Sequence, residues 1–129
     1  MEFNDDAFVL SARPHGETGA IVELLTQMHG RYAAHVAGGA SRRMKPYLQP
    51  GARVLASFRS RTYEQLGSAT LEPVGEGPAA LFDDSLALNG LAAAAAIVAA
   101  ALPEREPHPG AFLAFEALFS ALALSLIHI

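Results

Sequence analysis

The segment from Gly38 to Gly51, GGASRRMKPYLQPG, concentrates positive charge on a stretch rich in glycine and proline. It carries Arg42, Arg43 and Lys45 within four residues, and Tyr47 follows two positions later. Cations gathered on a loop that can bend close to a partner reach successive phosphates, and binding gains from the counterions that the polyanion releases. A neighbouring aromatic ring can stack on a base with little regard to sequence. These residue types predict binding of a nucleic acid.

This cluster belongs to a longer basic window. Residues 24–63 contain no Asp or Glu, so their seven Lys and Arg residues give a local charge of +7, although the whole chain carries −4. Beyond that window, eight of the 13 carboxylates face a single cation, Arg105. Such an uneven distribution favours a polyanionic partner for the positive part. The candidate contacts are these cations and the two tyrosines in or beside the window: Arg31, Arg42, Arg43, Lys45, Tyr47, Arg53, Arg59, Arg61 and Tyr63. The alternative is that the basic loop is merely solvated and the tyrosines cover a core.

Apolar residues that alternate with polar ones predict five short strands, at residues 5–14, 20–26, 31–37, 53–61 and 67–74. In the fourth run Val54, Ala56 and Phe58 share the face that would line a core, and its three arginines share the opposite, solvated face. Phe8 is expected in the core by the same alternation. Five short strands with few helical connections fit a small antiparallel barrel, since closure removes exposed edges.

From residue 78 onward the period changes to that of helices. Asp83, Asp84 and Ser85 are suitable residues to start a helix, the alanine-rich run 86–102 follows, and Pro103 ends it. Pro109 can open a second, antiparallel helix, whose apolar stripe we expect to remain partly uncovered; the stripe consists of Phe112, Phe115, Phe119 and Leu122. The run 86–102 is only 17 residues long and contains Asn and Gly. A membrane span needs about 20 apolar residues, so a buried helix of a soluble protein is predicted instead.

Catalytic chemistry has little support in the sequence. Cysteine is absent, and no phosphate-binding loop, nucleophile elbow or H-E-x-x-H pair occurs. The histidines lack metal-ligand spacing, and the pairs Asp5–Asp6 and Glu104–Glu106 are expected to be solvated, the first at a fraying terminus. We therefore predict a protein that is not an enzyme and has no catalytic residue, metal or cofactor. The first residues lack an export signal, which favours the cytoplasm.

Ordered motifs give the sequence a family resemblance. The stretch VLSARPHGETGAIVELLTQMHGRYAAHVAGGASRR, followed by LQPG, resembles the N-terminal OB-fold of the RecO family of bacterial DNA-repair and recombination mediators. LPEREPHPGAFLAFEALFSAL is similar to the connector and next helix of that family's helical domain. The resemblance implies a mainly β, five-stranded OB-fold barrel at 1–76 and an incomplete α-helical domain at 77–123. We expect 124–129 to be a tail that is not native.

The resemblance also implies a function. The family binds single- and double-stranded DNA, anneals strands, and helps to load recombinase, with RecR, onto strands coated by single-strand-binding protein. This role implies a nucleoid-associated protein, and the site for single-strand-binding protein would lie in the helical region that this chain lacks. Arg42, Arg43 and Arg31 match the family's Gly-Ala-Arg loop and H-G-R turn, whereas the other candidates rest on charge alone. The alternatives are a barrel that binds structured RNA or a ribosomal partner and, third, one that binds acidic protein surfaces.

Three local expectations accompany the family pattern. Gly19 replaces the acidic residue that commonly follows G-E-T, which should loosen the turn. The side chain of Thr18 could hold that turn through a hydrogen bond. The helix that an OB-fold usually carries between its third and fourth strands is not expected in residues 38–51, because Gly and Pro are frequent there.

Overall fold

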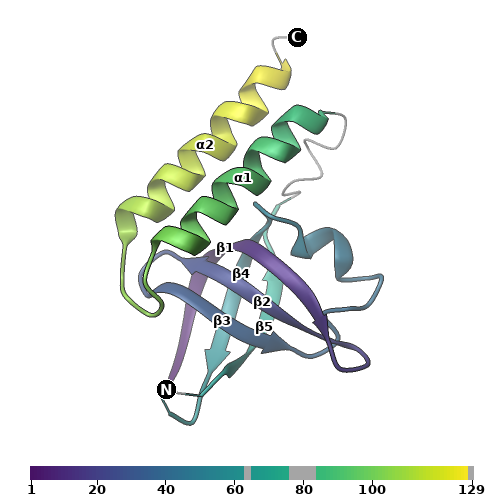
Figure 1. The fold of residues 1–129 in the computed structure, drawn as a ribbon, viewed down its shortest axis with the longest axis vertical. Helices are drawn as coiled ribbons and strands as arrows, with labels where there is room; N and C mark the ends of the chain where they lie inside the picture. The colour runs from purple at the N-terminus through teal and green to yellow at the C-terminus, as the bar shows by residue number, and fades with distance from the viewer. Residues whose placement is uncertain (63–64, 76–83, 128–129) are drawn as a thin grey trace.

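The structure, a computed structural model, describes residues 1–62, 65–75 and 84–127, with side chains described as far as residue 122. Five strands close into a barrel in the order β1-β2-β3-β5-β4 (Figure 1). Their bounds are β1 Glu2–His15, β2 Gly19–Thr26, β3 Gly30–Val36, β4 Arg53–Arg59 and β5 Gly67–Pro73. Neighbours are antiparallel except β3 and β5, which pair in parallel at two positions only. The predicted five-stranded OB-like barrel is confirmed.

The barrel encloses the apolar residues that alternate along its strands. Val54, Ala56 and Phe58 of β4 all point into this core, as their spacing predicted. The longest strand, β1, is buried on both faces over residues 7–10. Val9 lies inside the barrel, whereas Phe8 is buried in a second core on the outside. Phe8 is thus buried as expected, but beneath the helices.

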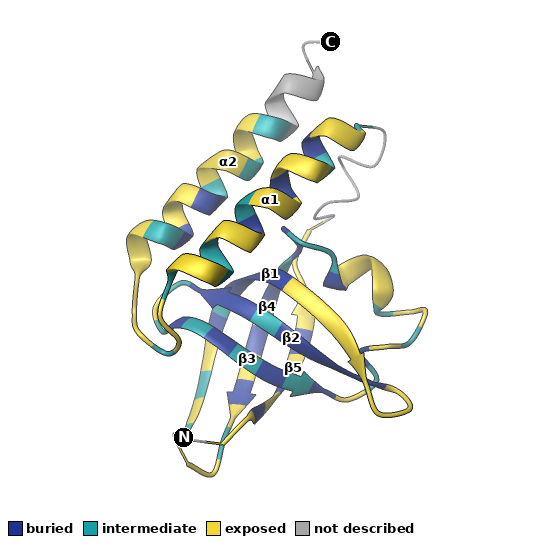
Figure 2. Cartoon of the chain, in the orientation of Figure 1, coloured by how far each residue is buried: buried dark blue, intermediate teal, exposed yellow. Residues whose placement is uncertain are grey.

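Two antiparallel helices, α1 Ser85–Ala101 and α2 Pro109–Ile127, cover one side of the barrel (Figures 1 and 2). The Asp84 side chain accepts a hydrogen bond from the Ala87 N–H (3.0 Å) and begins α1 as predicted. Phe112 and Phe115 pack on Phe8 with ring centroids 5.0 and 4.9 Å away. The stripe was expected to be partly uncovered: its first half is buried against the barrel, whereas Phe119 and Leu122 are only partly buried. Within the described residues, neither helix has the length and apolar character required to cross a membrane.

Two expected boundaries concern the helical part: its start after residue 76 and the end of its second helix at residue 123. The expected boundary between residues 76 and 77 falls in 76–83, which lie outside the described residues. The backbone of α2 continues to Ile127, although no helical pattern was expected beyond residue 123. A run of Leu, Ser and Ile can extend a helix that earlier residues have already begun, because propagation is easier than nucleation.

The connector between α1 and α2 is fastened to the barrel. The Arg105 N–H donates to the Arg31 carbonyl oxygen (2.7 Å), and Arg31 and Glu104 form an isolated parallel bridge. The side chains of Glu104 and Glu106 are exposed as expected. The backbone of Glu106, however, lies against the start of β3, where a Cβ added to Gly30 would come within 2.0 Å of the Glu106 carbonyl oxygen.

The start of β1 is also ordered. Asp5 is buried, and its carboxylate accepts hydrogen bonds from the Met28 N–H (2.8 Å) and meets His29 Nδ1 at 2.8 Å. The His29 ring stacks on Phe3 with centroids 3.9 Å apart. The expectation of a solvated carboxylate at a fraying end is therefore wrong for Asp5, because β1 pairs with β4 from Glu2 onward.

The G-E-T turn is held by contacts that its sequence alone does not predict. The Thr18 carbonyl oxygen, rather than its hydroxyl, is the fastening group in the described structure, accepting from the Ala40 N–H (3.0 Å). Gly19 is buried, and a Cβ there would lie 2.3 Å from His35 Nε2. Glycine at this position therefore permits close packing against His35, and the loosened turn stays a prediction.

Candidate nucleic-acid interface

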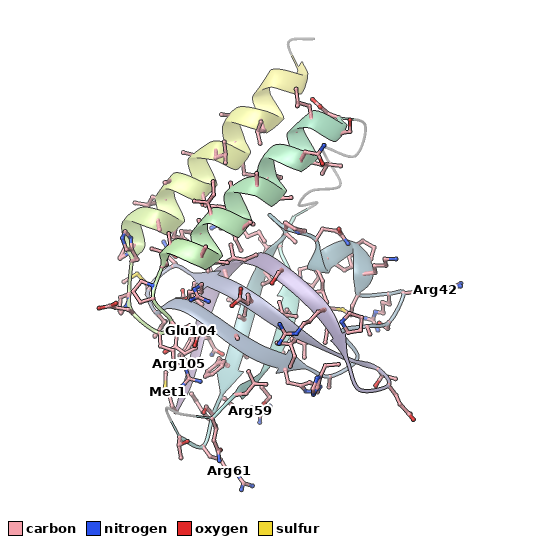
Figure 3. The ribbon with its side chains drawn as sticks, in the orientation of Figure 1. Met1, Arg42, Arg59, Arg61, Glu104 and Arg105 are labelled. Atoms are coloured by element: carbon pink, nitrogen blue, oxygen red, sulfur yellow. The ribbon has the colours of Figure 1, made fainter. Side chains whose placement is uncertain are left out.

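The described cations of the basic window do not form one continuous patch but fall into three groups. The loop cations Arg42, Arg43 and Lys45 lie on the connection between β3 and β4, and the strand-end cations Arg59 and Arg61 lie at and just beyond the end of β4. The helix-facing arginines are Arg31 and Arg53. Figure 3 shows Arg42 projecting from one side of the barrel and Arg59 and Arg61 at the end far from the helices. Tyr63 lies outside the described residues.

The helix-facing arginines join the barrel to the helices. Arg31 Nη1 donates to Glu23 Oε1 (2.7 Å) and its Nε donates to the Leu102 carbonyl oxygen (2.9 Å). Arg53 Nη1 donates to Glu116 Oε2 (2.6 Å), and its guanidinium lies 5.6 Å from the centroid of the Phe112 ring. Both charges are thus compensated by carboxylates.

The strand arginines were expected on one positive face, but their positions along β4 lie far apart. Arg53 and Arg59 are six residues apart, which corresponds to roughly 20 Å along a strand. Arg53 lies at the end that faces the helices, whereas Arg59 pairs with Glu2 at the far end. A shared face of one strand therefore does not make these arginines a single patch.

The connection that carries the loop cations is anchored from below. It contains a short 3-10 helix, η1 Lys45–Leu48, in place of the longer helix of other OB-folds, as its glycine and proline content favours. Leu48 is buried in the barrel core, and the Gly51 N–H donates to the Val9 carbonyl oxygen (2.8 Å). The side chains of Arg42, Arg43 and Lys45 remain exposed, and Tyr47 is 39% exposed beside them. The loop thus presents its cations on a defined frame.

Two hollows lie along the line where β3 meets β5, which we name the β3–β5 seam. The two strands pair only where Ala34 meets Gly67 and His35 meets Ser68. On one side of this pairing, Arg43 and Thr70 line a hollow under the loop. On the other side, a second hollow has a lining that includes His35, Ser68, Arg59, Arg61 and one carboxylate, Glu2. Residues 67–71 of β5, roughly 13 Å of strand, run through both hollows.

Lys45 lines neither of the two hollows on the β3–β5 seam. It lines a third hollow together with Arg13, Pro14 and Gln49, between the end of β1 and the loop. Arg13 lies outside the acid-free window, because Glu17 and Glu23 separate it from residues 24–63. Its outward position on β1, two residues after Ser11, was the available signal.

A second missed residue, Arg105, lies at the end of the barrel that carries Arg59 and Arg61 (Figure 3). Its Nη2 donates to the Gln65 carbonyl oxygen (2.7 Å), and its guanidinium lies 5.3 Å from the centroid of the Tyr32 ring. The sequence suggested only a lone cation among carboxylates. No local sequence pattern predicts these contacts of Arg105, because they depend on the docking of the connector against the barrel. In the part of the chain that is described, no group of three or more acidic or histidine side chains could hold a metal ion.

Comparison with known proteins gives consistent matches. A family model described as "Recombination protein O N terminal" matches residues 1–74. The chain is 79% identical, over 122 residues, to the DNA repair protein RecO of Phenylobacterium zucineum (strain HLK1), covering 95% of this chain and 50% of that protein. It is 67% identical over 127 residues to the protein of the same name from Caulobacter sp. (strain K31), covering 98% and 52%. The chain spans about half the length of the curated relatives it matches.

Proposed function

The chain belongs to the Recombination protein O (RecO) family, and on that premise we propose that it binds DNA along the β3–β5 seam as part of a bacterial recombination mediator. The relatives' names support a role in DNA repair. In its finer form, the proposal is that the barrel binds single- and double-stranded DNA and anneals complementary strands. It also includes a share in recombinase loading, with RecR, on strands coated by single-strand-binding protein.

The seam supports this proposal because it has exposed cations at both ends. Arg43 borders one hollow, and Arg59 and Arg61 border the other. Among the described residues, no carboxylate forms an ion pair with these three, in contrast to the helix-facing arginines. Their charge is therefore available to phosphates. Between the two ends, the half-buried ring of His35 and the exposed side chain of Leu66 offer surface on which bases can stack or pack.

The test neutralises one cation at each end of the seam, in the double variant Arg43→Gln with Arg61→Gln. Binding of single-stranded DNA should weaken for every sequence, because phosphate contacts carry no base information. The slope of log K against log salt should fall by about 1.4, since each phosphate contact on a single strand contributes about 0.7. Fluorescence anisotropy of a labelled oligonucleotide at several salt concentrations measures both quantities.

The matched control is Arg13→Gln with Arg53→Gln, which removes the same charge away from the seam. Its slope should stay at the original value once circular dichroism has confirmed folding at the assay temperature. Equal losses in the two double variants would mean that binding follows net charge, and the seam would then not be the site. Faster annealing of two complementary oligonucleotides separates the finer proposal from a barrel that binds structured RNA.

A further inference from the structure

The connection between β4 and β5, which carries Arg61, is held by few contacts in its described part. The Ser60 backbone exchanges hydrogen bonds with Met1, at 2.9 and 2.7 Å. The Ser60 hydroxyl donates to the Thr62 carbonyl oxygen and, at 3.4 Å, to that of Gln65. The shorter contact to the Gln65 oxygen comes from Arg105 Nη2, at 2.7 Å. This donor lies 40 residues further along the chain, in the connector between the helices.

Arg105 is itself fixed at three points. Its N–H donates to the Arg31 carbonyl oxygen (2.7 Å), and its φ of 60° is in the left-handed region that residues with side chains rarely adopt. Its guanidinium lies 5.3 Å from the ring centroid of Tyr32 and 5.8 Å from that of Phe58, over the end of the barrel core. A side chain held in this way directs its Nη2 at the Gln65 carbonyl oxygen.

We propose that Arg105 is a positioning residue for DNA binding, holding Gln65 at the hollow of the seam that Arg61 also lines. The inference rests on the function proposed above. It makes the docking of the helical connector a determinant of how well the barrel holds phosphates. Because coupling is reciprocal, DNA bound at Arg61 also stabilises the docked connector. Arg105 acts through Arg61 and does not itself contact DNA.

The principal variant is Arg105→Gly, because glycine accepts the left-handed backbone and the hydrogen bond to Arg31 is retained. We expect about a fivefold loss of affinity for a labelled single-stranded oligonucleotide and a salt slope lower by about 0.7, the contribution of one phosphate. Amide exchange at Gln65 and Leu66 should accelerate, while exchange in β2 stays slow. Arg105→Lys keeps a positively charged hydrogen-bond donor and should restore part of the affinity.

The comparison with Arg61→Gln separates this inference from the function on which it rests. If Arg105 acts through Arg61, adding Arg105→Gly to Arg61→Gln should cause no further loss. An equal loss in both backgrounds would overturn the positioning role. If Arg61→Gln weakens binding while Arg105→Gly changes neither slope nor exchange, the inference fails and the seam stands. If Arg61→Gln has no effect, and neither does the double variant of the seam, the proposed function fails as well.

Discussion

Replacing Phe112 with alanine is expected to lower the free energy of unfolding by about 3 to 5 kcal/mol. The Phe112 side chain is completely buried, with 0% exposure, at the junction of α2 and the barrel. It contacts Phe8, whose ring centroid lies 5.0 Å away, and the Arg53 guanidinium, 5.6 Å from its own centroid. The variant loses this apolar contact and leaves a cavity where two elements meet. Urea denaturation followed by circular dichroism measures the change.

The neighbouring residue provides the control for this prediction. Leu113 is on the same turn of α2 but is 56% exposed, so Leu113→Ala should change the free energy of unfolding by no more than about 0.5 kcal/mol. Alanine also favours helix slightly in both variants, which removes propensity as an explanation. If the two variants were equally stable, the helices could not be packed on the barrel through Phe112.

Local periodicity was sufficient to predict most of the barrel. The alternation of Val54, Ala56 and Phe58 needs only the geometry of one strand, and these residues all line the core. The second core beneath the helices was harder to foresee. Alternation alone puts Phe8 on the face of β1 opposite Val9, but that face is buried only because residues of α1 and α2, far along the chain, pack on it.

The sequence predicted the charge of the basic window correctly, but it did not predict which of its arginines are exposed and unpaired. The acid-free window was real, but Arg53 pairs with Glu116, 63 residues away. Arg31 pairs with Glu23, which lies just before the window begins. Salt bridges between distant segments follow from tertiary packing, so counting charges along the chain overestimates the exposed positive surface. The β3–β5 seam was hidden for the same reason, because it needs a parallel pairing of strands that are not consecutive.

Replacing Gly30 with alanine should be the most damaging change of a single small side chain, with a loss of about 2 to 5 kcal/mol. The φ of Gly30 is 87°, where a Cβ costs about 1 to 2 kcal/mol. The added carbon would also lie 2.0 Å from the backbone oxygen of Glu106 and 2.5 Å from its carbonyl carbon. Backbone cannot rotate away as a side chain can, so the connector must move, at a further cost of about 1 to 3 kcal/mol. Denaturant unfolding again gives the measured value.

Gly16→Ala isolates the backbone part of this effect. Its φ of 72° is similar, but no atom lies within 4 Å of the added carbon, so only about 1 to 2 kcal/mol should be lost. The difference between the two variants reports the contact between the barrel and the connector. A displaced connector would also withdraw Arg105 from Gln65, so Gly30→Ala should weaken DNA binding under conditions where the barrel remains folded, whereas Gly16→Ala should not. Similar stabilities for the two variants would contradict the docked position of the connector.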